Sequence, residues 1–300
     1  MPDIQANGFT IHYESLGRDT DPPIVLVMGL ALQMIFWPDQ FCQMLVDRGF
    51  RVIRFDNRDV GLSSHFDHLG KPNLMFEYAR HLMGFKMRGR YQLDDMARDT
   101  IALVEGLGLK RVHLVGASMG GMIAQNVAAM APEKIITLTS IMSTTGRRSL
   151  PQPSWAARGA LFQPPPKQGD IAAATRRSVR VFQVIGSKTY PPAPGVFEAW
   201  CERHAKRGMN PAGAVRQLMA IAAAGDRTKL VRTIKVPTLV LHGDEDCLVP
   251  PTHGMETARV IREGGGQATF MMIEGMGHDL PLPLLPQIVG AIGGHCEALT

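Results

Sequence analysis

A serine between two glycines carries the strongest chemical signal in the sequence, in the motif Gly116-Ala117-Ser118-Met119-Gly120. The motif lies between a strand-like apolar segment and a helix-like one, so the chain turns sharply at Ser118. Such a turn strains the central residue, and side chains two positions away on either side would collide, which requires glycine at both. We predict that the Ser118 hydroxyl projects from the strand end as a nucleophile; the alternative is a glycine-rich turn with an incidental serine.

A serine hydroxyl is a weak nucleophile at neutral pH, so the chain must also provide a base. Of the ten histidines, His278 follows the last predicted strand, within Gly275-Met276-Gly277-His278-Asp279, and therefore lies at the same sheet edge as Ser118. Other histidines fit structural roles, since His113 falls inside a buried strand and His242 at a strand end. We predict that His278 is the base.

An acid that orients the histidine is expected after another strand, between Ser118 and His278 in the chain. The turn that follows His242 offers three candidates, Asp244, Glu245 and Asp246. A turn that begins at Gly243 directs its fourth residue back toward the sheet edge, which favours Asp246. The two acids that are not used are expected to form an exposed acidic turn.

Cleavage of an acyl bond also needs hydrogen-bond donors for the negative oxygen of the transition state. The backbone N–H of Met119 heads the helix after Ser118 and is one candidate. The loop at residues 28–31 follows another buried strand, and its Leu30 N–H is the second candidate. We predict that Met119 and Leu30 form the oxyanion hole, and that the reaction needs no metal and no cofactor.

The elements that position these residues alternate between strands and helices. Asn7-Gly8 separates two strand-like segments and is a strong signal for a two-residue hairpin turn. Further strands are predicted at residues 24–28, 51–55, 112–115, 135–142, 236–242 and 268–273, and helices at 39–48, 93–107, 119–130, 252–263 and 284–292. This order indicates an α/β fold with a mostly parallel, doubly wound sheet and an antiparallel N-terminal hairpin.

The connection at residues 143–235 is far longer than the usual link of a few residues and one helix. It contains 16 Lys or Arg and 4 Asp or Glu, a charge of about +12, whereas the whole chain carries +5. Its apolar stretches at 171–184 and 196–221 are long enough to pack, so we predict a mainly helical lid inserted into a core of residues 1–142 and 236–300. A second long connection, at 73–90, is expected either to form a pocket wall or to pack on the core.

Composition excludes several classes of protein. With 45% apolar and 20% charged residues, the chain is neither disordered nor fibrous. The longest apolar run, at residues 24–32, is short of the roughly 20 residues of a membrane span, and the N-terminus lacks a secretory signal pattern. The four cysteines are scattered, which favours a reduced, cytoplasmic protein.

These residues resemble the α/β-hydrolase superfamily over nearly the whole chain, and within it the serine esterases of bacteria related to aclacinomycin methylesterase. The resemblance rests on six segments, VMG at 27–29, WPD at 37–39, VIRFDxRDxGxS at 52–63 (x for positions that do not count), GASMG at 116–120, VPTLV at 236–240 and GMGH at 275–278. It implies Ser118 as nucleophile, His278 as base and Asp246 as acid. Residues 56–63 are interpreted as structural support. Two features differ from many relatives. Met28 stands where many wider relatives have histidine, and the connection at 73–90 is long. Both border the expected pocket.

The predicted function is hydrolysis of carboxylic esters through an acyl-serine, with a small-molecule ester as partner; the resemblance alone implies esters or lactones of bulky polyketides. Carbon–carbon bond hydrolases, thioesterases, cofactor-free perhydrolases and proline aminopeptidases use the same three residues and remain alternatives, as does a non-catalytic small-molecule-binding protein. The arginine clusters of the lid are short and no nucleic-acid motif accompanies them, which favours a solvated face over a nucleic-acid or membrane contact. The sequence indicates no oligomeric state.

Overall fold

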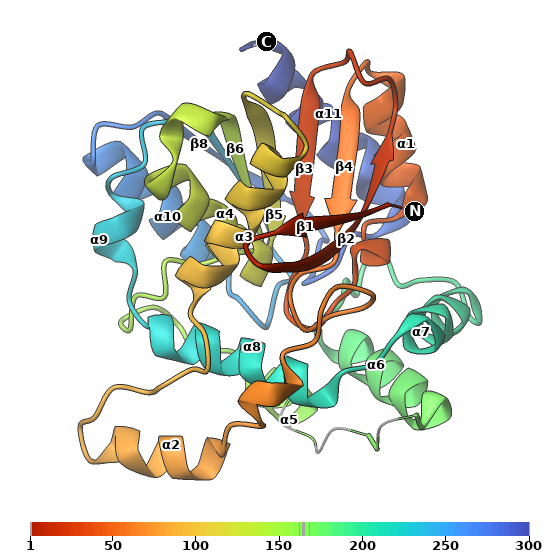
Figure 1. The fold of residues 1–300 in the computed structure, drawn as a ribbon, viewed down its shortest axis with the longest axis vertical. Coiled ribbons are helices and arrows are strands. Elements are labelled where there is room, and N and C mark those ends of the chain that lie inside the picture. Colours follow the sequence, from red (N-terminus) through yellow and green to blue (C-terminus); the bar gives the residue numbers. More distant parts are fainter. Residues whose placement is uncertain (1, 162, 164–165, 168, 300) are drawn as a thin grey trace.

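An eight-stranded sheet in the order β1-β2-β4-β3-β5-β6-β7-β8 forms the centre of the computed structural model, which describes residues 2–161, 163, 166–167 and 169–299 (Figure 1). β2 pairs antiparallel with β1 and β4, and the other neighbours are parallel, which confirms the predicted sheet. Asn7 and Gly8 turn the hairpin with φ angles of 50° and 82°. The strands are β1 (Asp3–Ala6), β2 (Phe9–Leu16), β3 (Pro23–Val27), β4 (Arg51–Phe55), β5 (Val112–Ala117), β6 (Ile135–Ile141), β7 (Thr238–Gly243) and β8 (Ala268–Ile273).

Helices cover both faces of the sheet. One apolar core lies under α1 (Asp39–Asp47) and α11 (Leu285–Glu297), and the other lies under α3 (Leu93–Gly106), α4 (Met119–Met130) and α10 (Thr252–Glu263). The side chains of β3 alternate between the two cores, Val25 and Val27 into one and Ile24 and Leu26 into the other. Burial on both faces explains why this strand is apolar without interruption.

The chain leaves the sheet between β6 and β7 and forms a mainly helical insertion, as predicted. Its helices are α5 (Trp155–Leu161), α6 (Ile171–Ile185), α7 (Val196–Arg207), α8 (Pro211–Ala224) and the short α9 (Thr228–Val231). In Figure 1, α5 to α8 lie below the carboxyl ends of the strands. The predicted apolar stretch at 196–221 contains two helices, because Asn210 caps a new helix that Pro211 opens.

Two ion pairs with little or no exposure attach the insertion to the core. Arg207 on α7 lies 2.6 Å from Asp56, and Arg216 on α8 lies 2.6 Å from Asp59. The side chains of Arg216 and Asp59 are both fully buried. A buried charge is tolerated only when it is paired, so these contacts constrain where α7 and α8 lie. They support the interpretation of residues 56–63 as structural.

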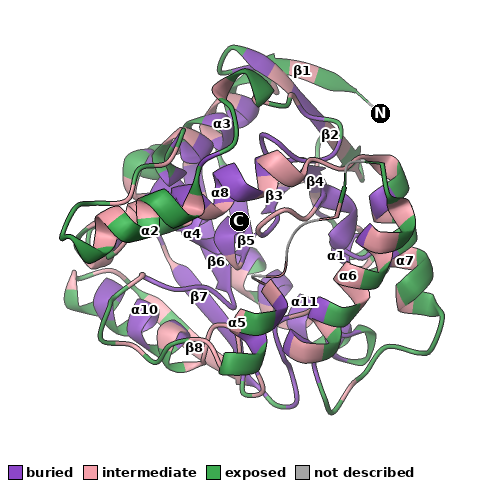
Figure 2. Ribbon diagram, turned by 90° about the horizontal axis from the view of Figure 1, so that it is seen from below, coloured by how far each residue is buried: buried purple, intermediate pink, exposed green. Residues whose placement is uncertain are grey.

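The second long connection, expected either to form a pocket wall or to pack on the core, adds a further helix to the fold. It contains α2 (Leu74–Leu82), and no residue from 73 to 90 belongs to an apolar core of the described chain. Most of this helix is exposed in the view from below (Figure 2). None of the described helices combines the length and the apolar character that crossing a bilayer requires.

The remaining short helices are of the 3-10 type. They are η1 (Met34–Phe36), η2 (Asp67–Leu69), η3 (Pro132–Lys134) and η4 (Leu282–Leu284). η1 follows the loop after β3, and its Met34 N–H donates to Asp56 at 2.8 Å. The same carboxylate therefore connects the loop after β3, the loop after β4 and α7 of the insertion.

Candidate active site

Ser118 occupies the sharp turn between β5 and α4, with backbone angles of φ 55° and ψ −119°. A side chain at Gly116 would collide with the carbonyl oxygen of Gly120, and one at Gly120 would collide with that of Val27. Both positions therefore require glycine for the close approach of α4 to the sheet. The turn holds Ser118 in a left-handed conformation that is strained for a residue with a side chain.

Ser118, His278 and Asp246 form a continuous chain of hydrogen bonds. Ser118 Oγ lies 2.9 Å from His278 Nε2, and His278 Nδ1 lies 2.7 Å from Asp246 Oδ2. A carboxylate can only accept, so Asp246 makes Nδ1 the donor and leaves Nε2 of the neutral ring to accept the Ser118 proton. This is the geometry that a nucleophile, a base and an orienting acid require.

Asp246 is buried and strongly held as an anion. Burial by itself would raise its pKa, but the charge of His278 and the hydrogen bonds from His242 and His278 together hold the pKa well below its usual range. Its second oxygen accepts the N–H groups of Leu248 and Val249 at 2.9 and 2.8 Å. The carboxylate is therefore charged at all pH values at which the fold is expected to work.

The other two acids of this turn, expected to be exposed without a further role, both accept hydrogen bonds from neighbouring segments. Asp244 accepts the N–H of Gly275, at the start of the loop that carries His278, at 2.7 Å. Glu245 accepts the N–H groups of Lys188 and Thr189 at 2.7 and 3.1 Å, together with the Thr189 hydroxyl. Asp244 therefore ties the acid loop to the histidine loop, and Glu245 ties it to the helical insertion.

The chain just after α6 also supports the histidine loop, which the sequence patterns did not indicate. Ser187 Oγ donates to Asp279 at 2.6 Å and accepts the N–H of Gly277 at 2.7 Å. The backbone N–H of His278 donates to the carbonyl of Ile185 at 2.8 Å. Burial raises the pKa of Asp279, while its bonds to Ser187 act in the opposite direction. The orientation of His278 therefore depends on the insertion as well as on Asp246.

The two predicted oxyanion donors lie in segments that adjoin Ser118. Met119 N heads α4, and Leu30 follows Gly29, where an added Cβ would lie 3.3 Å from the Ser118 Cβ. Neither N–H donates to an acceptor within the described part of the chain. Two amides beside the serine that are free to donate are what an oxyanion hole needs.

A glutamine from the insertion anchors the Leu30 loop. Ala31, which has a left-handed φ of 57°, donates its N–H to Gln217 Oε1 at 2.8 Å. Gln217 Nε2 in turn donates to the carbonyl of Arg58 at 2.8 Å, and the glutamine is fully buried. The carbonyl of Met28 accepts a further bond from Asn57 at 2.9 Å. No sequence pattern singled out Gln217, because its partners lie more than 150 residues away.

A mostly parallel sheet, a helical insertion over its carboxyl edge and a serine on a strand-to-helix turn define the α/β-hydrolase class. The chain belongs to the α/β hydrolase fold family, whose model matches residues 22–282. It is 28% identical to a rhodomycin D methylesterase of Streptomyces sp. (strain C5), over 99% of this chain and 98% of that protein. It is 29% identical to a rhodomycin D methylesterase of Streptomyces peucetius, over 97% and 96%. Among solved structures, the enol-lactonase from Burkholderia xenovorans LB400 has a similar fold, with a TM-score of 0.73, 21% identity, and coverage of 99% of this chain and 100% of that chain.

Proposed function

We propose that the protein is a serine hydrolase that cleaves carboxylic esters through an acyl-enzyme intermediate. The observation that carries the proposal is the unbroken chain of hydrogen bonds from Ser118 through His278 to Asp246. The proposed catalytic residues are these three, with the N–H groups of Met119 and Leu30 as the oxyanion hole. The chemistry requires only side chains and amides of this chain and an ester of a small molecule.

In the first half of the reaction, Ser118 Oγ attacks the ester carbonyl carbon while His278 Nε2 takes the hydroxyl proton. The carbonyl oxygen becomes negative and accepts hydrogen bonds from Met119 N and Leu30 N. Each such donor contributes about 3 kcal/mol to the stability of the transition state. The carbon–oxygen bond to the alcohol then breaks, and the alcohol leaves with the proton from Nε2.

In the second half, the same nitrogen takes a proton from water as the water oxygen attacks the acyl-serine. The intermediate collapses to the carboxylic acid and free Ser118, which recovers its proton from His278. Asp246 stays ionised throughout, because it orients the ring and stabilises the imidazolium without taking a proton.

The proposed substrates are methyl esters of bulky ring systems, and the names of two relatives support this choice. The relatives of nearly equal length are named as methylesterases that act on rhodomycin D.

A panel of p-nitrophenyl esters of increasing chain length, run beside aromatic polyketide methyl esters, thioesters and aminoacyl-proline amides, tests the reaction class. We expect turnover of oxygen esters, and a Ser118→Ala variant with unchanged Tm whose kcat is lower by about 10⁴-fold or more. Quenched reactions should contain enzyme whose mass is increased by the acyl group. Equal turnover by the alanine variant, or a preference for the thioester or the amide, would refute the proposal.

A further inference from the structure

Helix α2 and the three residues that follow it present large apolar side chains that the described part of the chain leaves exposed. Six of them are between 54% and 79% exposed, namely Met75, Phe76, Tyr78, Leu82, Met83 and Phe85. Single exposed apolar residues are common on protein surfaces, but six within eleven positions form a patch of the kind that marks an interaction site. The helix itself is regular, since Asn73 caps it through a hydrogen bond to the N–H of Phe76.

Basic residues accompany this apolar patch along the chain. Residues 71–90 contain five Lys or Arg and one Glu, a net charge of +4. Glu77 is already paired with Arg80 at 3.0 Å. The exposed cations Lys71, Lys86, Arg88 and Arg90 make no ion pair with any residue that the structure describes. The positive charge of the segment is therefore available to an external partner.

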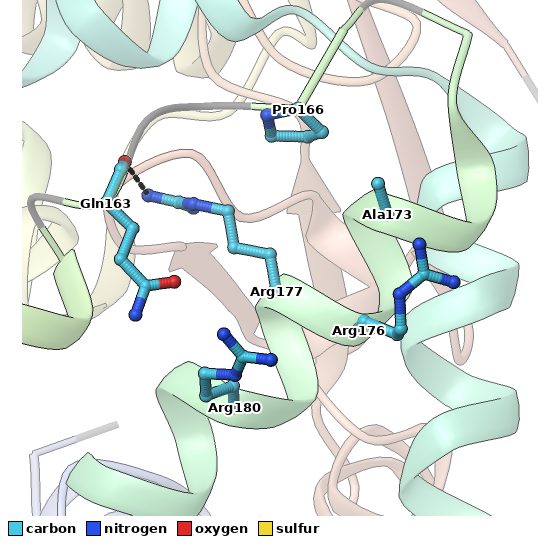
Figure 3. A pocket seen from close by; sticks show the side chains of 6 residues that line it. All are labelled: Gln163, Pro166, Ala173, Arg176, Arg177 and Arg180. Carbon is cyan, nitrogen blue, oxygen red and sulfur yellow. Dashed lines mark hydrogen bonds between the residues drawn. The ribbon is translucent and has the colours of Figure 1, made fainter.

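The patch lies at the end of the molecule that carries the helical insertion, below the carboxyl ends of the strands (Figures 1 and 2). Two further features occur at this end. Trp155 on α5 is 85% exposed, with Arg158 stacked 5.0 Å from its ring. Arg176, Arg177 and Arg180 on α6 line a shallow pocket of about 200 Å³ (Figure 3). Apolar and positively charged groups are therefore combined at the end of the molecule that carries the helical insertion.

We propose that α2 docks this protein on an anionic lipid surface, with its apolar side chains among the acyl chains and its lysines and arginines at the phosphates. A nine-residue helix is too short to cross a bilayer but suits the interface, where an apolar side and flanking cations both find partners. Docking through this face would bring the carboxyl edge of the sheet toward the membrane.

Charge argues against a second copy of the chain as the occupant. A two-fold contact through α2 would place one +4 segment against another, with only Glu77 available on each side and already paired. An anionic bilayer supplies opposite charge and an apolar layer together, and each cation near such a surface contributes about fivefold to binding.

Sedimentation with vesicles tests the proposal without any measurement of turnover, so its outcome is independent of the proposed reaction. We expect the protein to bind vesicles of phosphatidylglycerol and phosphatidylcholine, to bind less as salt is raised, and to bind pure phosphatidylcholine at least about tenfold more weakly. Trp155 is the exposed tryptophan of the insertion, so its emission should shift to shorter wavelength on binding.

Variants of α2 locate the contact. The double variant Leu82→Glu, Phe85→Glu should bind at least about tenfold more weakly, and Lys86→Gln and Arg88→Gln about fivefold more weakly each. Met255→Glu on α10 is the matched apolar control, and Lys110→Gln, before β5 and at the opposite end of the strands, is the matched charge control; both should bind as the parent does.

Three results would overturn the proposal. The first is equal binding to anionic and neutral vesicles, or none to either. The second is binding to anionic vesicles that the α2 variants leave unchanged. The third is a dimer, seen by analytical ultracentrifugation, that Leu82→Glu converts to monomer, which would assign the patch to a second copy of the chain.

Discussion

Gln217 Oε1 accepts a hydrogen bond from the N–H of Ala31 at 2.8 Å, so a buried side chain of the insertion holds the loop that presents Leu30 to the candidate site. This contact joins α8 to the loop after β3 across 186 positions of the chain. The insertion therefore does more than cover the site, because it also orients one of the two proposed oxyanion donors.

Replacement of Gln217 by leucine tests this role. The variant loses the acceptor for Ala31 N, so the Leu30 amide should be less well aligned with the oxyanion. We expect kcat to fall by about tenfold to a hundredfold with KM nearly unchanged, because the donor acts mainly in the transition state. Gln43→Leu on the exposed side of α1 serves as the control. A fall in Tm with unchanged kcat would assign a purely structural role to Gln217.

Asp246→Asn should leave the fold intact and lower kcat by about 10⁴-fold, since the amide can favour the wrong tautomer of His278. The folded-state pKa of Asp246 lies below its unfolded value of about 3.9, so its ionisation stabilises the fold above that pH. The stabilisation is lost as pH falls toward the folded pKa. Urea unfolding at pH 7 and pH 3 should therefore show a smaller difference between parent and variant at pH 3; a difference that is constant with pH contradicts the assignment.

Ser187→Ala removes the hydroxyl that donates to Asp279 and accepts from Gly277. Because Asp279 is partly buried, the loss should cost about 1 kcal/mol in the free energy of unfolding. It should also lower kcat, since His278 follows Gly277 directly. Ser178→Ala on α6, more than two turns earlier, is the control. Both quantities are measured on the same preparations. A loss of stability without a loss of kcat would show that Ser187 does not position His278.

Arg216→Met leaves Asp59 buried without its cation. Burial opposes ionisation of Asp59, whereas the hydrogen bonds from Arg216, the Phe66 N–H and Tyr91 lower its pKa. The variant removes the largest of these favourable contributions. We expect a loss of about 3–5 kcal/mol in the free energy of unfolding. The double variant Arg216→Met, Asp59→Asn should recover part of that loss. No recovery would indicate that Asp67, the second partner of Arg216, dominates.

Local patterns in the sequence are sufficient to predict the sheet and the order of its strands and helices along the chain. The apolar run of β3, the Asn7-Gly8 turn and the glycines around Ser118 each depend on neighbours within a few positions, so the chain itself reveals them. The same reasoning selected Asp246 among three adjacent acids, and the structure brings it to His278. Met119, Leu30 and His278 were likewise indicated by their positions at strand ends.

Other features depend on residues that are distant in the chain, and only the tertiary structure decided them. Gln217 binds Ala31, Ser187 binds the histidine loop, and Glu245 binds the chain after α6, because the insertion folds back over the strand ends. The sequence left the connection at 73–90 open between a pocket wall and packing on the core, and in the structure none of its residues belongs to an apolar core of the described chain. The spacing of apolar residues indicates which face of a helix or strand is apolar. Whether that face is buried depends on which other segments of the chain pack against it.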